Sequence, residues 1–159
     1  MSAVIKAGIA LAVLVEIFSV VLILAGLHES APMVAGIVFI LVAIVLNVGC
    51  VFWGLKQTAD NGYGKQLLNG LLIGLVAGVL IFAFSMLNLS VLFPDYLDQS
   101  KTATIEWLES MNIPQPQLEA QVAQIEGQSA MRQAVSGLIG TVITSLIVGA
   151  IISIFVRKK

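Results

Sequence analysis

Glu16 is the one ionisable side chain that lies well inside an apolar segment of this sequence. It shares a helix face with the small residues Gly8, Ala12 and Ser19, so we expect it to point toward neighbouring helices and away from lipid. A carboxyl group in such surroundings can form an interhelical hydrogen bond, handle protons or ions, or contact another subunit. All three roles are open from the residue type alone.

Asn47 is the second polar candidate, because it interrupts the next apolar segment. At a rise of ~1.5 Å per residue, Glu16 and Asn47 lie roughly 14 Å and 12 Å from the same end of their segments. We therefore expect the two side chains to meet at one depth, with a protonated Glu16 donating to Asn47 and with Ser145 near that level. These residues form the predicted intramembrane polar site, and Ser85 and Asn88 form a weaker polar pair in the third segment.

Enzymatic chemistry is poorly supported. The single histidine, His28, stands at a loop edge where we expect a solvated ring, and the single cysteine, Cys50, lies in an apolar segment. No cluster of cysteine and histidine has the spacing of metal ligands. The stretch Gly62-Tyr63-Gly64-Lys65 lacks the Gly-Lys-Ser/Thr ending of a phosphate-binding loop. We expect no enzymatic activity, no metal and no cofactor.

The elements that must position these residues are membrane spans. Of 159 residues, 58% are hydrophobic and 11% are charged, whereas soluble domains are about 45–50% apolar and about 25% charged. Four apolar segments meet the roughly 20-residue requirement for crossing a bilayer, and helices are the expected form because lipid cannot pair with backbone groups. The predicted spans are residues 7–27, 33–55, 67–93 and 135–156. Because the first carries Glu16 and is long for a signal peptide, we treat it as a retained span.

Small residues recur at every fourth position in two of these spans, and residues four apart share a helix face. The two series are Gly70, Gly74 and Gly78 in the third span, and Gly137, Thr141, Ser145, Gly149 and Ser153 in the fourth. Close packing drives helix association in lipid, so we expect the two small faces to oppose each other. Homo-oligomerisation through one of these faces is the alternative.

The basic residues predict the orientation. If the four spans alternate in direction, most Lys and Arg residues fall on one side of the membrane. They are Lys6, Lys56, Lys65, Arg157, Lys158 and Lys159. The other side holds Lys101 and Arg132. Since cytoplasmic loops carry the excess of basic residues, both termini are predicted to be cytoplasmic.

Residues 94–133 form the one sizeable stretch outside the spans, and they are predicted to be an extracytoplasmic helical hairpin broken near Pro114. Nothing but Gly127 would stop its second helix from running on into the fourth span. The hairpin is either a lid packed on itself and on lipid headgroups or a docking surface for a partner. The candidate partner surface consists of Trp107, Glu106, Glu109, Leu118 and Val122. A net charge of −1 argues against nucleic acid as that partner.

Several stretches resemble an uncharacterised bacterial family of small four-span membrane proteins, a domain of unknown function of Bacteroidetes type. They are Lys6-Ala7-Gly8-Ile9, Gly54-Leu55-Lys56, the Gly62-Tyr63-Gly64-Lys65 turn, Leu92-Phe93-Pro94-Asp95-Tyr96-Leu97, the acidic hairpin and the basic end of the fourth span. The resemblance covers nearly the whole chain. It implies a bacterial cytoplasmic (inner) membrane and carries over no activity and no functional residue.

The sequence thus predicts one all-α domain over residues 1–159, a four-transmembrane-helix bundle in a lipid bilayer with the hairpin between spans three and four. The expected function is that of a non-enzymatic accessory, assembly or interaction subunit, either in a homo-oligomer or with a partner in a membrane complex. The alternative is a minimal oligomeric transporter or a proton- or ion-handling protein that uses Glu16.

Overall fold

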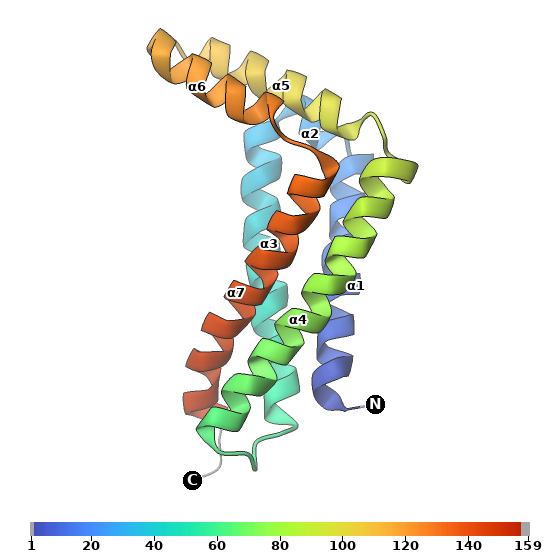
Figure 1. Cartoon of the computed structure of the whole chain (residues 1–159), viewed down its shortest axis with the longest axis vertical. Coiled ribbons are helices and arrows are strands. Elements are labelled where there is room, and N and C mark those ends of the chain that lie inside the picture. Colours follow the sequence, from blue (N-terminus) through green and yellow to red (C-terminus); the bar gives the residue numbers. More distant parts are fainter. Residues whose placement is uncertain (1, 157–159) are drawn as a thin grey trace.

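The computed structural model describes residues 2–156, and the chain in this range forms a helical bundle capped at one end by a hairpin (Figure 1). The elements are α1 (Ala3–Leu24), α2 (Leu27–Ser30), α3 (Pro32–Lys56), α4 (Tyr63–Leu87), the π-helical segment η1 (Asn88–Leu92), α5 (Tyr96–Ser110), α6 (Gln115–Glu126) and α7 (Ala130–Val156). The basic residues Arg157, Lys158 and Lys159, used above for orientation, lie outside the described residues.

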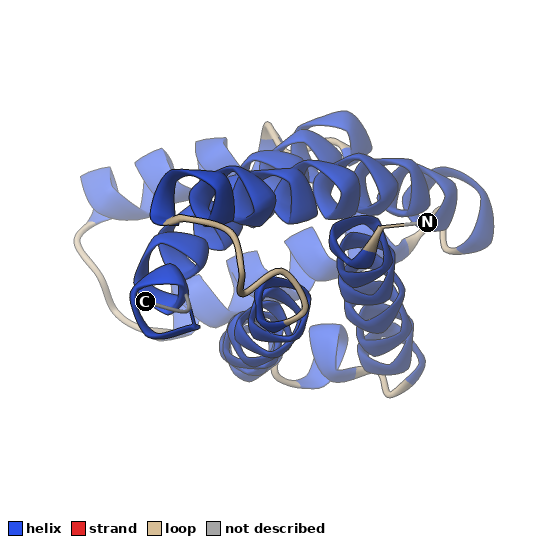
Figure 2. Ribbon diagram, turned by 90° about the horizontal axis from the view of Figure 1, so that it is seen from below, coloured by secondary structure: helices blue, strands red, loops and turns tan. Residues whose placement is uncertain are grey.

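Four of these helices are long and apolar enough to cross a membrane: α1, α3, α4 continued by η1, and α7. The all-α, four-span prediction is therefore confirmed, and the chain is a multi-pass membrane protein. Viewed along the bundle, helices joined by short loops make up the whole described chain (Figure 2). The start of α1 and the end of α7 lie at the end opposite the hairpin (Figure 1). These two ends of the bundle are called the hairpin end and the terminal end below.

The boundaries of the helices differ from the predicted ones at two places that matter. Helix α1 begins four positions early, at Ala3, because the Ser2 hydroxyl accepts a hydrogen bond from the Ile5 backbone N–H at 3.4 Å and caps the helix. The prediction that α6 could continue into the fourth span is wrong. Helix α6 ends at Glu126 and α7 begins at Ala130, so a short break separates the hairpin from the span.

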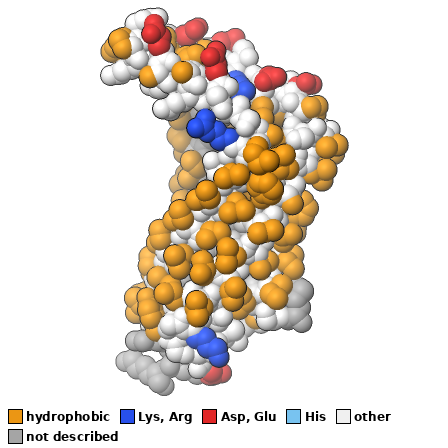
Figure 3. All heavy atoms as spheres, in the orientation of Figure 1, with side chains coloured by type: hydrophobic (Ala, Val, Ile, Leu, Met, Phe, Trp, Pro, Cys, Tyr) orange, Lys and Arg blue, Asp and Glu red, His pale blue; other side chains and the backbone are white. Residues whose placement is uncertain are grey.

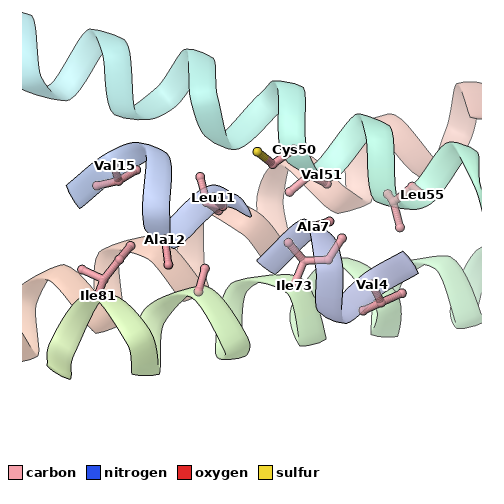
Figure 4. Close-up of a cluster of buried hydrophobic side chains, with 11 residues drawn as sticks. Val4, Ala7, Leu11, Ala12, Val15, Cys50, Val51, Leu55, Ile73 and Ile81 are labelled. Atoms are coloured by element: carbon pink, nitrogen blue, oxygen red, sulfur yellow. The ribbon is translucent and has the colours of Figure 1, made fainter. Parts of the chain in front are cut away.

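The core is a narrow seam between helices. Buried apolar side chains from α1, α3 and α4 interdigitate along it, with Leu11, Val51 and Ile73 almost fully covered (Figure 4). Only 17–33% of the most apolar window of each span is buried within the chain, so most span side chains point outward. These outward residues form the apolar surface that Figure 3 shows along the bundle, which is the surface lipid would cover.

The hairpin lies across one end of the bundle and extends beyond it (Figure 1). Helix α5 packs on α2 and on the start of α3, and its Leu108 is 5% exposed. Helix α6 packs chiefly on α5 and contains no buried residue. The hairpin is therefore attached to the spans through α5, and α6 is attached chiefly through its contact with α5.

Candidate functional site

The Glu16 carboxylate is bound by two side chains of the third span. Ser85 Oγ donates to one carboxylate oxygen at 3.2 Å, and Asn88 Nδ2 donates to the other at 2.8 Å. Glu16 is 9% exposed and Asn88 is 8% exposed, so the group is closed off between α1 and the hairpin end of the third span. The predicted pairing of Glu16 with Asn47 is wrong. Glu16 bonds instead to Ser85 and Asn88, the two residues predicted to form a weaker polar pair.

The error lies in the direction that the two side chains face. A Cβ built at Gly54 of α3 would come within 2.9 Å of the Ala7 Cβ of α1, so Ala7 and Gly54 lie at one level. Counted from that level at ~1.5 Å per residue, Glu16 lies about 14 Å and Asn47 about 11 Å toward the hairpin end. The two residues are therefore at similar depths, but Glu16 faces the third span and Asn47 faces α7.

The backbone at Asn88 is unusual and helps to aim this side chain. Phe93 N–H donates to the Asn88 carbonyl at 2.7 Å, five positions back, and the π-helical segment begins at Asn88. A π-helical turn inserts an extra residue per turn and rotates the side chains around it, and such turns are frequent at functional positions. The turn ends the third span and places Asn88 against α1.

Asn47 and Ser145 form a second, separate polar contact. Asn47 Nδ2 donates to Ser145 Oγ at 2.8 Å, which ties α3 to α7 in the middle of the bundle. Asn47 is 3% exposed and Ser145 is fully buried. Asn47 Oδ1 is also buried, and no other described atom pairs with it. Of the three residues predicted to form one polar site, the structure brings Asn47 and Ser145 together and places Glu16 elsewhere.

The small residues of the third and fourth spans lie where α4 meets α7. A Cβ built at Gly70 would come within 3.0 Å of the Gly149 Cα, and one built at Gly74 would come within 2.7 Å of the Ser145 Cβ. A Cβ at Gly78 would meet the Leu138 carbonyl oxygen at 3.1 Å. At Gly74 only glycine allows the present spacing of the two backbones, whereas a Cβ at Gly70 or Gly78 would require α7 to shift by a few tenths of an ångström.

The remaining predicted packing residues of α7 behave differently from one another. Ser153 is buried, and its hydroxyl donates to the Gly149 carbonyl of its own helix at 2.6 Å. A Cβ at Gly137 would reach Ile81 of α4 at an ordinary 3.4 Å. Thr141 is half-buried and lines a groove of about 540 Å³ between α3 and α7, on the side where Gly140 has open space.

Sequence reasoning missed two further close approaches. A Cβ at Gly8 would lie 2.8 Å from Val76 of α4, and one at Gly54 would lie 2.8 Å from Ile73 and 2.9 Å from Ala7. Gly8 has Ala12 four positions later and Gly54 has Cys50 four positions earlier, but neither belongs to a long series of small residues like those of the third and fourth spans. They are the positions at which α1 and α3 reach the same stretch of α4.

A polar network at the terminal end was also missed. The fully buried Gln66 donates through Nε2 to the Leu55 carbonyl at 3.2 Å, and it accepts from Thr58 Oγ1 at 3.0 Å. Asn69 Nδ2 donates to Thr58 Oγ1 at 3.1 Å. These bonds satisfy the carbonyls at the end of α3 and fix the turn into α4. The sequence feature that could have predicted this network is a glutamine, Gln66, at the start of an apolar span.

The predicted partner surface divides into two kinds of residue. Glu106 and Glu109 are exposed, whereas Trp107, Leu118 and Val122 are half-buried. Trp107 and Glu106 line a hollow above the start of α3, together with Met33. His28 also departs from expectation, since its ring is 7% exposed beneath the hairpin and is not solvated.

Comparison with known proteins identifies the family. The sequence profile of a family described as a protein of unknown function (DUF4199) matches residues 6–158, so the chain belongs to that family. No curated protein and no solved structure matches the chain.

Proposed function

We propose that this DUF4199 protein is a non-enzymatic integral membrane subunit that binds another membrane protein through its α5–α6 hairpin. The observation that carries the proposal is the position of α6. This helix contains no buried residue, packs chiefly on α5, and extends past the bundle it is attached to (Figure 1). A helix of this kind adds little to the stability of its own bundle, and it offers a free surface at the membrane boundary.

The charge of the hairpin end indicates the kind of partner. Acidic side chains there outnumber basic ones by seven to two, and red atoms gather on the hairpin in Figure 3. The acidic set is Glu29, Asp95, Asp98, Glu106, Glu109, Glu119 and Glu126, against Lys101 and Arg132. Complementary charge speeds association and selects partners. We therefore propose a partner with a basic surface at the same level.

The polar groups inside the spans support packing as their role. The Glu16 carboxylate and the Asn47 amide bond to separate sets of neighbours, and each contact joins two helices. Interhelical hydrogen bonds of this kind average about 0.6 kcal/mol and reach about 1.7 kcal/mol. Two contacts with separate partners on different helices suit a bundle that holds its shape better than they suit a continuous ion path.

Site-specific photo-cross-linking in native membranes tests the proposal. A photoreactive residue replaces Gln121 on the exposed side of α6, and a matched one replaces Val45, which is 69% exposed on α3. We expect the probe at Gln121 to give a discrete protein adduct and the probe at Val45 to give chiefly lipid adducts. An adduct of twice the chain mass would identify a second copy as the partner, and lipid adducts alone at Gln121 would contradict the proposal.

Proton handling through Glu16 is the second candidate. The observation in its favour is that Glu16 is the only acidic residue within the four described spans. Intramembrane acids commonly mark proton and ion paths.

For the orientation of the chain, we propose cytoplasmic termini in a bacterial inner membrane. The Lys and Arg distribution and the family resemblance given above support this orientation.

A further inference from the structure

A pocket of about 230 Å³ lies where the hairpin meets the bundle. It is formed by residues from α1, α2, α3, α5 and α7, so the hairpin closes it from above. Its lining includes Ser19, His28, Gly36, Phe39, Tyr96 and Ser100. Ligand pockets usually begin at about 300 Å³, so this one suits a small molecule.

His28 lines this pocket, and its ring carries a buried nitrogen that no described residue bonds. Its Nε2 lies 3.4 Å from Gln99 Oε1 and 3.7 Å from Glu29 Oε1, and both of these oxygens are acceptors. The tautomer with its proton on Nε2 fits these two acceptors, and in this tautomer Nδ1 has a lone pair. The Nδ1 atom is buried, and it has no hydrogen-bond partner among the described residues. A buried acceptor without a partner is costly, and a ligand that donates a hydrogen bond would remove that cost.

The other walls of the pocket suit a ligand with an apolar body. The Tyr96 ring lies against the His28 ring at a centroid distance of 4.7 Å, and Phe39 also lines the pocket. The Tyr96 hydroxyl is hydrogen-bonded with Ser100 and is thereby held in place. Aromatic faces attract cations as well as apolar groups.

The charge around the pocket decides the sign of the ligand. Glu29 lies 3.7 Å from His28, and Glu29, Asp98 and Glu106 line a separate hollow formed by α2 and α5. The acidic excess of this end raises the local concentration of cations and lowers that of anions. A positively charged group that donates a hydrogen bond would pair with the lone pair of His28 and would also be attracted by the acidic side chains around the pocket.

We propose that this pocket binds a small organic ammonium ion, whose N–H group donates to Nδ1 of His28 and whose apolar body lies against Phe39 and Tyr96. The site is independent of the α6 surface proposed for the protein partner. It joins α1, α2, α3, α5 and α7, so its occupancy also fastens the hairpin to the bundle.

Nuclear magnetic resonance provides a direct readout, because the chain contains a single histidine. The full chain, labelled with ¹⁵N-histidine and held in lipid nanodiscs, gives one imidazole Nδ1 signal. We expect 2-phenylethylammonium to shift this signal saturably. The neutral isostere 2-phenylethanol should bind about tenfold more weakly, because it forms a hydrogen bond without charge. The anion phenylacetate should produce no saturable shift.

Two glycines of α3 supply a matched pair of variants. Gly36 lines the pocket, Gly49 does not, and a Cβ at either position meets nothing within 4 Å. Gly36→Leu should fill the pocket and abolish the ammonium-induced shift, while Gly49→Leu should leave it unchanged. Neither substitution touches the hydrogen bonds of His28, so the unliganded Nδ1 signal shows that the site has remained folded.

The outcomes separate the possibilities. Saturable binding of the ammonium ion that is lost only in Gly36→Leu supports the proposal. Equal responses to the ammonium ion and the alcohol, tighter binding of phenylacetate, or an identical ammonium response in both leucine variants would each overturn it.

Discussion

The Ser145 side chain lies directly over Gly74. A Cβ built at Gly74 would come within 2.7 Å of the Ser145 Cβ, and the Ser145 hydroxyl accepts a hydrogen bond from Asn47 at 2.8 Å. One serine thus sets the spacing of α4 and α7 and fastens α3 to both. Packing at this point depends on the absence of a side chain on one helix and on a short polar side chain on the other.

Replacement of Gly74 should break this contact. Gly74→Leu forces a large side chain against Ser145 and Val142, and we expect a loss of at least about 1–3 kcal/mol, the usual cost of overpacking. Leu75→Ile changes the neighbouring residue, which is 41% exposed on the outer face, and should be nearly neutral. Thermal unfolding in detergent, followed by size-exclusion chromatography, measures both. Equal stability of the two variants would contradict the close contact.

The fold could be predicted from the sequence because its cause is local and strong. Apolar segments of about 20 residues have few structures open to them in lipid, and a stretch with Pro114 and Pro116 between polar helices makes a hairpin. The hydrogen-bond partners of Glu16 could not be predicted in this way. They depend on how each helix is rotated about its axis in the bundle, which turns Glu16 toward Ser85 and Asn88 and turns Asn47 toward Ser145.

The burial of His28 depends on contacts that no local pattern reveals. The ring is covered because α5 folds back over α2 and places Tyr96 and Gln99 beside it, about 70 positions later in the chain. Such a contact depends on how the hairpin crosses the end of the bundle. Hydropathy and helical periodicity describe single elements, so they do not contain this information.

The orientation of the chain predicts which positions a membrane-impermeant thiol reagent can reach. In a Cys50→Ser background, Gln115→Cys in the hairpin should be labelled in intact cells, and Asn61→Cys in the α3–α4 turn should be labelled only after the cells are opened. Gln115 is exposed, so access to it is limited by the membrane alone. Labelling in the reverse pattern would place the termini outside and the hairpin in the cytoplasm.

Tyr96 should ionise later than an ordinary tyrosine. Burial beneath the hairpin raises the pKa of its phenol, and the hydrogen bond with Ser100 opposes this in part. Because the folded pKa lies above the unfolded one, the contribution of Tyr96 to stability is fully present below the unfolded pKa. It is lost as the pH rises through the folded pKa.

Ultraviolet titration measures this shift, since the chain has two tyrosines and Tyr63→Phe leaves Tyr96 alone. The tyrosinate absorbance of this variant in detergent should develop at a higher pH than that of N-acetyltyrosinamide in the same detergent. A midpoint equal to or below that of the reference compound would show that Tyr96 is open to solvent, and that the hairpin does not close over it.

Glu16 gives the prediction that separates the two candidate functions. Glu16→Gln retains an oxygen that can accept from Asn88 Nδ2, so we expect normal expression and stability within about 0.5 kcal/mol of the original chain. Glu16→Leu leaves Ser85 and Asn88 without their acceptor and should cost about 1–3 kcal/mol. Both variants are compared by thermal unfolding in the same detergent.

Flux measurements then decide whether Glu16 also carries protons. In vesicles containing the purified chain, a packing role predicts no proton or ion flux above that of empty vesicles under an imposed pH gradient or voltage. A transport role predicts a flux in the original chain that Glu16→Gln abolishes while its unfolding temperature stays unchanged. We expect no flux, because Ser85 and Asn88 already use both carboxylate oxygens as the acceptors of an interhelical contact. A flux that depends on Glu16 would replace the subunit role with transport.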